Sequence, residues 1–172
     1  LAFCPERLGE GSKMNDFTGY ALEEIRKIPI IVGGITPQST EVAVEFWQSL
    51  GIKTISVSSP KVAEMAKLAD NWWIDLNIAL ANELALLCEK IGIDAYEVIK
   101  AANTLPKNEY NVNILLPGCG VGGSCLTKDP WFVHHMGQTY GIELRTCQIS
   151  REINDEMPKH MYDLVTKALE SC

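Results

Sequence analysis

The stretch from Pro60 to Ile91 constrains the fold more than any other part of the chain, because it holds no glycine and no proline after its first residue. Proline suits the first turn of a helix, and a glycine such as Gly92 commonly follows the last turn. Apolar residues recur at every third or fourth position, as along one face of a helix: Met65, Leu68, Trp72, Leu76, Leu80, Leu84, Leu87 and Ile91. We therefore predict one long amphipathic helix of about 30 residues.

The residues before this helix alternate between short apolar runs and helical patterns, which is typical of an α/β sheet. The elements expected there are strands at 1–4, 29–32 and 53–57 and helices at 20–27 and 39–50. Gly33 and Gly34 would close the second strand. Val42, Phe46 and Leu50 would share one apolar face of the helix at 39–50.

The residues after Gly92 are predicted to be mainly helical, with helices at 94–103, 129–141 and 149–170. Asp94 and Asp129 would cap the first two of these helices. Pro158 would kink or split the third helix, because proline cannot donate a backbone hydrogen bond. The predicted fold class is thus α/β followed by mainly α, with the division between residues 57 and 58.

The composition is that of an ordinary globular protein with an acidic balance. The formal net charge is −7, which argues against a nucleic-acid or membrane-surface partner. No stretch of roughly 18 apolar residues predicts a membrane span. No signal-peptide pattern is present, and the chain begins at Leu1 within an expected strand, so we expect it to be a piece of a longer protein.

The cysteines form neither a CxxC pair nor a Cys/His pattern with metal-ligand spacing. We therefore expect free thiols, no metal site and a reducing, cytoplasmic location. His134 and His135 are adjacent in the sequence, so they cannot share a helix face as two metal ligands would. The six cysteines are Cys4, Cys88, Cys119, Cys125, Cys147 and Cys172.

A glycine-rich loop from Pro117 to Cys125 carries the strongest chemical signal. Its glycines let backbone amides come close to a ligand, and Lys128 and Asp129 follow its terminal thiol. A nearby cation and oriented amides favour a thiolate, so Cys125 is a candidate nucleophile. Cys119 competes for this role, and a free cysteine can also be a small core residue.

The same loop matches the dinucleotide-binding pattern G-x-G-x-x-G from Gly118 to Gly123. That pattern requires a strand before it, a helix that opens within it and an acidic residue about 20 positions later. Residues 111–116 can form a strand and Glu143 has the spacing, but Pro130 stops a helix begun at the glycines. We therefore favour a loop that serves a thiol or a substrate.

Two pairs of polar residues are further candidates for a site. Lys67 and Asn71 share one face of the long helix, which is either solvated or aimed at a developing oxyanion. Glu6 and Glu10 follow the first strand, where α/β sheets bind ligands. A carboxylate there either moves a proton or is an exposed loop charge, and spacing alone leaves both pairs open.

In combination, these segments resemble the nucleotide-sugar 6-dehydrogenases, the UDP-glucose and GDP-mannose dehydrogenase family. The matching motifs, in order, are Cys4-Pro5-Glu6-Arg7 with Glu10, and residues 31–35, 63–71, 82–84, 101–104, 112–114 and 117–130. Residues 125–132 are most similar to the branch that oxidises UDP-N-acetylhexosamines, especially UDP-N-acetylmannosamine. Three positions depart from that branch: Cys119 replaces a proline, Asn111 replaces an arginine, and Lys128 is more like the UDP-glucose enzymes.

The resemblance implies an NAD-dependent, two-step oxidation of a sugar C6 alcohol to a uronate, through a thiohemiacetal and a thioester on Cys125. Lys67 and Asn71 would stabilise the C6 oxyanion, and Asp129 would orient or activate the water. Glu10 would accept a proton or position the water, and with Lys128 it would lie on the cofactor side. The residues implied to bind the UDP-sugar are Glu6, Arg7, Leu8, Asn113, Pro117, Gly118, Gly120 and Gly122.

The resemblance also implies a domain organisation. Residues 1–57 would end a Rossmann-like NAD-binding domain, and 58–172 would form a helical central domain that makes a homodimer through the long helix. Of Trp72 and Trp73, which point to different faces, one would pack in the core and the other would meet a second subunit. The isolated chain would not turn over, because the flanking domains are missing from it.

Three alternatives remain open from the sequence. The substrate can be UDP-glucose or GDP-mannose instead. The 3-hydroxyacid and 6-phosphogluconate dehydrogenases also use Lys-x-x-x-Asn on a helical domain, for a single oxidation without a thiol. The chain can also be a helical dimerisation module whose thiols are inert.

Overall fold

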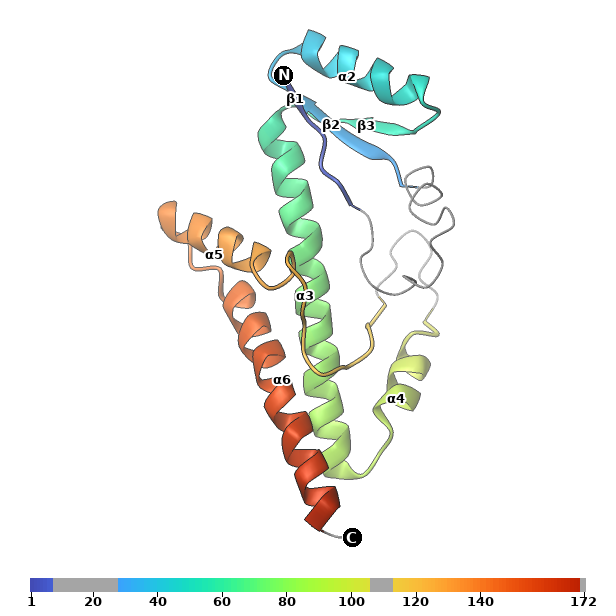
Figure 1. Cartoon of the computed structure of the whole chain (residues 1–172), viewed down its shortest axis with the longest axis vertical. Coiled ribbons are helices and arrows are strands. Elements are labelled where there is room, and N and C mark those ends of the chain that lie inside the picture. Colours follow the sequence, from blue (N-terminus) through green and yellow to red (C-terminus); the bar gives the residue numbers. More distant parts are fainter. Residues whose placement is uncertain (8–27, 106–112, 171–172) are drawn as a thin grey trace. The chain divides into compact units, whose positions relative to one another are not determined.

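The computed structural model of the protein describes residues 1–7, 28–105 and 113–170. The chain divides into two compact units, Leu1–Ala69 and Asp70–Cys172, and the division falls within the long helix. Most described residues are helical, and a small sheet lies in the first unit (Figure 1). The expected helix at 20–27 lies outside the described residues, and the predicted domain boundary after residue 57 remains a prediction.

The first unit holds a three-stranded sheet in the order β1 (Ala2–Phe3), β2 (Ile30–Gly34) and β3 (Thr54–Ser56). β1 pairs antiparallel with β2, and β2 pairs parallel with β3. The helix α2 (Pro37–Ser49) joins the two parallel strands, which makes a βαβ unit. All three predicted strands and the helix between them are confirmed.

Gly33 and Gly34 are the last two residues of β2 and pair with Phe3 and Ala2, so the strand ends at these glycines, as predicted, but includes them. Their role is to allow close packing. A Cβ on Gly33 would clash with the Ser59 carbonyl, and one on Gly34 would clash with the backbone of α2. Glycine within a strand commonly marks such a close approach of another backbone segment.

The apolar face predicted for α2 is present but exposed. Val42, Phe46 and Leu50 all retain more than half of their accessible surface, and no described residue of α2 is buried. Thr36 caps the helix by accepting a hydrogen bond from the Ser39 amide at 3.1 Å. Within the described part of the first unit, this helix therefore packs on the sheet without burying any of its side chains fully.

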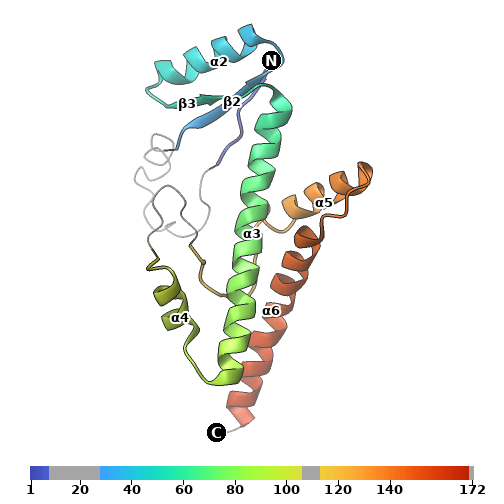
Figure 2. The same cartoon turned by 180° about the vertical axis from the view of Figure 1, so that it is seen from behind.

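The second unit is helical. The helix α3 (Pro60–Ile91) has the predicted bounds, and its part from Asp70 onward belongs here. The others are α4 (Ala95–Ala102), α5 (Asp129–Thr139) and α6 (Arg145–Glu170). The α6 helix runs beside the C-terminal half of α3 in both views (Figures 1 and 2). None of the described helices is both long enough and apolar enough to span a membrane.

Capping predictions are confirmed at one helix and wrong at another. Asp94 caps α4 by accepting a hydrogen bond from the Tyr96 amide at 2.8 Å. Asp129 does not cap α5. It is the first residue of that helix, and its side chain turns instead toward Asn71 on α3. The N-cap position belongs to Lys128, whose side chain makes no capping hydrogen bond.

Pro158 lies inside α6 without splitting it, so of the two predicted outcomes the split is wrong and the kink remains a prediction. Proline has no N–H for the carbonyl four residues earlier, which is that of Asn154. Gly120 lies against this carbonyl: a Cβ on Gly120 would be 2.5 Å from the Asn154 oxygen and 3.2 Å from Pro158 Cδ. The glycine-rich loop therefore packs on the turn of α6 that proline leaves open.

One buried face of α3 in the second unit is mainly polar, while Ala81 and Cys88 of the same helix are also buried. Asn71, Asp75 and Asn82 are buried there together with Ala79. Of the predicted apolar stripe in this unit, Leu80, Leu87 and Ile91 are exposed, whereas Trp72, Leu76 and Leu84 are partly buried. The periodic pattern thus predicted the helix correctly, but the stripe is only partly covered within the described chain.

Candidate functional site

The loop that carries Cys125 has no regular secondary structure before α5. Residues 113–118 form no strand, and no helix opens between Gly118 and Gly123. Turns at 124–128 lead directly into α5 at Asp129. The dinucleotide-binding pattern therefore lacks the helix it requires, and the loop interpretation is the one the structure supports.

At the start of this loop, two asparagine side chains make the backbone hydrogen bonds that a neighbouring strand would make in a sheet. Asn103 donates to the Ile114 carbonyl and accepts from the Ile114 amide, both at 2.9 Å. Asn77 on α3 donates to the Asn113 carbonyl at 2.7 Å and accepts from the Leu115 amide at 2.9 Å. Because each side-chain amide offers a donor and an acceptor, it satisfies backbone groups on both sides.

Cys125 is half-buried, and its thiol lies 3.7 Å from the Ser124 hydroxyl. The amides of Lys128 and Asp129 donate to the Cys125 carbonyl at 3.1 and 2.9 Å. The amides of Lys128 and Asp129 therefore bind the carbonyl of Cys125 and not its thiol. They fix the backbone of the turn that leads from Cys125 into α5.

Asp129 joins the turn to α3. Its Oδ2 accepts a hydrogen bond from Asn71 Nδ2 at 2.6 Å, and its Oδ1 pairs with Lys128 Nζ at 3.0 Å. Asp129 is 6% exposed and Asn71 is 5% exposed. The hydrogen bond and charge of Asp129 raise the pKa of Lys128, which stays cationic. Asn71 is therefore buried, so the alternative of a solvated position is wrong for it, and its role in a site remains a prediction.

Lys67, Glu6 and Arg7 belong to the first unit. Lys67 is half-buried on α3. Arg7 donates from Nη2 to the Pro29 carbonyl at 2.9 Å, so its guanidinium also ties two segments of this unit together. The predicted site residues Leu8 and Glu10 lie outside the described residues.

A small cavity adjoins Glu6 and Arg7. Its volume is about 120 Å³, and it lies beside the first residue of β2. It is lined by Cys4, Pro5, Glu6, Arg7, Ile28, Pro29, Ile30 and Trp47.

The glycines of the loop fall into two kinds. A Cβ on Gly118 or Gly122 would meet nothing within 4 Å, so space lies open beside them. Gly120 has φ of 100° and is packed against α6, so it is required for the fold of the loop. Of the predicted sugar-binding positions, Gly118 and Gly122 are thus accessible to a ligand, whereas Gly120 supports the loop from beneath.

Sequence reasoning missed the polar residues that hold this loop. Asn82 lies in one of the matching motifs, which implies no role for it, and none of the motifs includes Asp75, Asn77 or Arg151. A signal was present: Asn71, Asp75 and Asn82 recur at helical spacing within α3, beside the apolar stripe. A polar line at that spacing predicts either a solvated face or a buried network, and only packing distinguishes the two.

Among the described residues, the cysteines Cys4, Cys88, Cys119, Cys125 and Cys147 are free. Cys88 and Cys147 are buried, Cys119 is exposed, and Cys4 and Cys125 are intermediate. Burial, followed by the charge of Asp75, raises the pKa of Cys147 to about 11. No cluster of three or more His, Cys, Asp or Glu residues suited to a metal ion occurs in the described ranges.

Residues 61–156, more than half of the chain, match the model of the UDP-glucose/GDP-mannose dehydrogenase family, central domain. The UDP-N-acetyl-D-mannosamine dehydrogenase of Campylobacter jejuni is 36% identical over 99% of this chain and 38% of that protein. The NDP-N-acetyl-D-galactosaminuronic acid dehydrogenase of Ralstonia nicotianae is 38% identical over 98% of this chain and 36% of that protein. The chain therefore spans little more than a third of the length of these relatives.

Solved structures agree with these matches. The UDP-D-ManNAc dehydrogenase from Pyrococcus horikoshii superposes with a TM-score of 0.83 at 34% identity, over 99% of this chain and 37% of that one. A UDP-glucose dehydrogenase from Pyrobaculum islandicum gives a TM-score of 0.81 at 28% identity, over 98% of this chain and 37% of that one. The chain belongs to the UDP-glucose/GDP-mannose dehydrogenase family.

Proposed function

We propose that this chain is the part of a nucleotide-sugar 6-dehydrogenase that carries the catalytic thiol, and that the whole protein oxidises the C6 alcohol of UDP-N-acetylmannosamine to the uronate. The observation that carries the proposal is the arrangement of Cys125, Asp129 and Asn71. Cys125 lies in the turn that leads into α5, and four residues later a buried carboxylate receives a hydrogen bond from a buried amide on α3.

Cys125 would act as the nucleophile of the second oxidation. Its sulfur would add to the C6 aldehyde, with a proton passing to the new hydroxyl, to give a thiohemiacetal. Loss of a hydride and a proton from this adduct gives a thioester. Water then adds at the thioester carbonyl, the C–S bond breaks, and the uronate and the free thiol leave.

Asp129 and Asn71 would serve the oxygen chemistry around this thiol. A buried carboxylate that accepts a hydrogen bond from an amide is held in one orientation, and this suits it to orient a water. Asn71 has a second amide hydrogen, which can donate to an oxyanion at C6. Lys67, on the same helix, would supply a positive charge to that oxyanion, and Glu10 would accept a proton or position the water.

The described residues fit NAD as the cofactor. The parallel β2–α2–β3 unit is the building block of dinucleotide-binding sheets. Lys128 keeps an exposed ammonium group that suits contact with the cofactor, as would Glu10. When bound, NAD would accept one hydride from C6 in each oxidation. Residues 1–57 would then be the end of the cofactor domain, and 58–172 the central domain.

The proposed substrate is supported by the relatives and by the loop. Several relatives are named UDP-N-acetyl-D-mannosamine dehydrogenase, including that of Escherichia coli at 37% identity. The open space beside Gly118 and Gly122 would let the loop backbone approach the nucleotide sugar, together with Asn113 and Pro117. Glu6, Arg7 and Leu8 would contact the sugar from the first unit.

The exposed apolar stripe of α3 supports a homodimer. Leu80, Leu87 and Ile91 are exposed in the second unit, and a second copy of the helix would cover them. Trp72 is partly buried and Trp73 is half exposed, as expected if only one of them meets a partner. No nucleic-acid or membrane partner is proposed.

The test is the stoichiometry of NADH formed per UDP-N-acetylmannosamine consumed by the whole protein, with a Cys125→Ala variant in parallel. We expect two NADH per sugar for the wild type and at most one for the variant. One NADH per sugar from the wild type would contradict the thiol mechanism. NADH formed only from UDP-glucose or GDP-mannose would contradict the proposed sugar while keeping the reaction class.

A further inference from the structure

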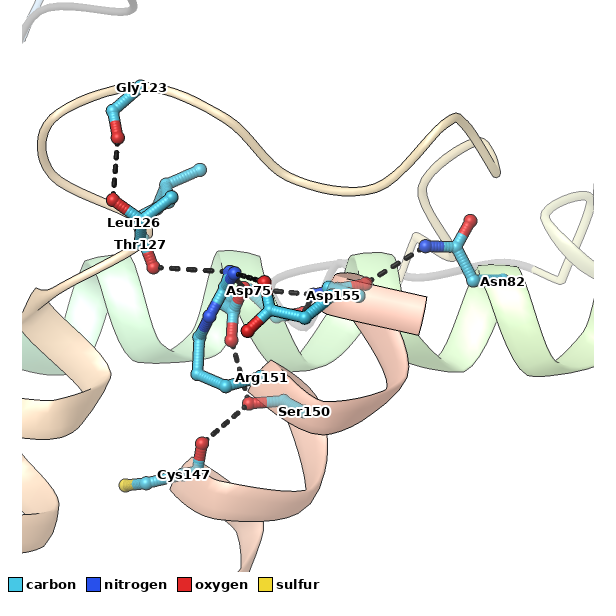
Figure 3. Close-up of polar contacts among 10 residues, drawn as sticks. Asp75, Asn82, Gly123, Leu126, Thr127, Cys147, Ser150, Arg151 and Asp155 are labelled. Carbon is cyan, nitrogen blue, oxygen red and sulfur yellow. Dashed lines mark hydrogen bonds and ion pairs between the residues drawn. The ribbon is translucent and has the colours of Figure 1, made fainter. Parts of the chain in front are cut away.

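A buried ionic network lies beneath the loop that carries Cys125, and Asp75 on α3 is at its centre (Figure 3). Its carboxylate accepts hydrogen bonds from Ser150 Oγ at 2.7 Å, from Arg151 Nη1 at 2.7 Å and from Asn154 Nδ2 at 2.8 Å. All four side chains are almost fully buried. Arg151 also pairs with Asp155 at the edge of the network.

Two branches lead from this network to the two ends of the loop. In the first, Arg151 Nη1 lies 3.5 Å from the Leu126 carbonyl, the residue after Cys125. In the second, Asn154 Oδ1 accepts from Asn82 Nδ2 at 2.9 Å, and Asn82 Oδ1 accepts from the Gly118 amide at 2.9 Å. Between the two ends, Gly120 packs on the Asn154 carbonyl.

Stability alone does not require charged groups at this position. A buried ion pair can often be replaced by apolar side chains of similar volume without loss of stability, because burial removes both charges from water. Apolar side chains cannot, however, hydrogen-bond the backbone of a loop that has no sheet or helix partner. The branches at Gly118 and Leu126 supply that function on either side of the thiol.

We propose that Asp75 is a positioning residue for Cys125. It orients Arg151 and Asn154, and through them and Asn82 it fixes both ends of segment 118–126. The catalytic meaning of this inference rests on the proposed function, because the thiol must reach the C6 aldehyde. Displacing a reacting group by about 1 Å can lower a rate roughly 100-fold.

Three single variants of the whole protein separate positioning from stability. Asp75→Ala removes the carboxylate that accepts from both Arg151 and Asn154, and it leaves Asn154 only its hydrogen bond to the backbone carbonyl of residue 75, at 3.0 Å. Asp75→Asn keeps one oxygen for Arg151 and Asn154, and its amino group can face the Ser150 hydroxyl. Ser150→Ala is the matched control, because it also removes a buried hydrogen bond to Asp75 but has no contact with the loop.

The first readout is the number of NADH formed per sugar. For Asp75→Ala we expect the ratio to fall from two toward one, with kcat lower by roughly 10- to 100-fold, because only the second oxidation needs the thiol. For Asp75→Asn and Ser150→Ala we expect a ratio of two. A simple loss of folded protein would lower both oxidations equally and leave the ratio at two, and this result for folded Asp75→Ala would overturn the proposal.

The second readout is amide hydrogen exchange of the loop peptide, which needs no activity. We expect faster exchange at Gly118 in Asp75→Ala and unchanged exchange in Ser150→Ala. If the wild type made no NADH, the proposed function would fail, and this readout would still decide whether Asp75 holds the loop. Equal exchange in the two variants would overturn the positioning role.

A further variant covers the case in which Asp75→Ala does not fold. Asn82→Ala removes only the branch to Gly118 and leaves the Asp75–Arg151 pair intact. We expect Gly118 exchange to rise at least about tenfold and kcat to fall. Unchanged Gly118 exchange in folded Asn82→Ala would contradict the proposal.

Discussion

In the second unit, α3 buries polar side chains on one face and exposes apolar side chains on another, which is the reverse of an ordinary amphipathic helix. On one face, Asp75 and Asn82 are fully buried. On the other, Leu80, Leu87 and Ile91 are 52%, 55% and 59% exposed. Polar groups are usually the exposed ones, because burial removes their hydrogen bonds to water.

This difference indicates that the two faces of α3 make different kinds of contact. The polar face is buried because its groups find partners in α6 and in the loop of Cys125, so their hydrogen bonds with water are replaced. The apolar face is only partly covered within the described part of the second unit, and its exposed residues Leu80, Leu87 and Ile91 would suit contact with a second subunit. The following predictions test this division, beginning with the largest expected effect.

Replacing Arg151, the buried cation that pairs with Asp75 of the polar face, should give the largest loss of folding stability. We expect Arg151→Met to lower the free energy of unfolding by about 3–5 kcal/mol, because Asp75 would remain as a buried, uncompensated charge. Urea unfolding monitored by circular dichroism would measure this. The double variant Asp75→Leu/Arg151→Met is the control and should recover much of the loss, since neither charge remains. A loss below about 1 kcal/mol for the single variant would show that the pair is hydrated.

Removing the amide that orients Asp129 should affect turnover more than folding. We expect Asn71→Ala to lower kcat by roughly 100- to 1,000-fold, because a donor to a developing oxyanion and the partner of Asp129 are both lost. Steady-state kinetics of the whole protein would measure this. Glu83→Ala, an exposed position of the same helix, should stay within about twofold of the wild type. A comparable loss of kcat in both variants would show that the polar face has no special role in turnover.

Cys147 offers a pH-dependent test of the polar network. Burial and the charge of Asp75 raise its pKa from 9.0 to about 11, so the folded state holds the thiol proton more tightly than the unfolded state. The contribution of this group to stability is complete below pH 9 and should be lost as pH rises toward 11, by roughly 2 kcal/mol. Urea unfolding from pH 8 to 11 would measure it, with Cys147→Ala as the control that lacks this slope. If the unfolding free energies of the two proteins changed equally with pH, the pKa of Cys147 would not differ between the folded and unfolded states.

The elements of the fold could be predicted well because their signals are local. The bounds of α3 follow from Pro60, Gly92 and the apolar period between them, and Asp94 caps α4 as its position predicts. The wrong predictions depend on residues far apart in sequence. Asp129 turns to Asn71, 58 positions away, and Pro158 is accommodated because Gly120 covers its turn.

The candidate site could be predicted only where chemistry and motif coincide. Cys125 stands out because glycines, a lysine and an aspartate surround it in the sequence. Asp75 carries no such signal, because its partners Ser150, Arg151 and Asn154 lie more than 70 residues later. A buried polar residue is identified by its partners, and those are known only from packing.

The smallest effect on folding should come from the apolar face. We expect Leu87→Gln to change the unfolding free energy of the monomer by no more than about 0.5 kcal/mol, because this side chain is already exposed. In the dimer the same change would bury an amide at an apolar contact, so dissociation should occur at a protein concentration roughly tenfold higher. Sedimentation velocity over a dilution series would measure this.

Leu169→Gln, at an exposed apolar position on α6, is the matched control for this prediction and should leave association unchanged. A loss of several kcal/mol in the monomer would show that the stripe packs within the chain, which would end the contrast between the two faces. Unchanged association of Leu87→Gln would place the dimer contact elsewhere. If only Leu87→Gln dissociates, the single helix α3 serves both purposes, with one face holding the loop of Cys125 and the other joining the subunits.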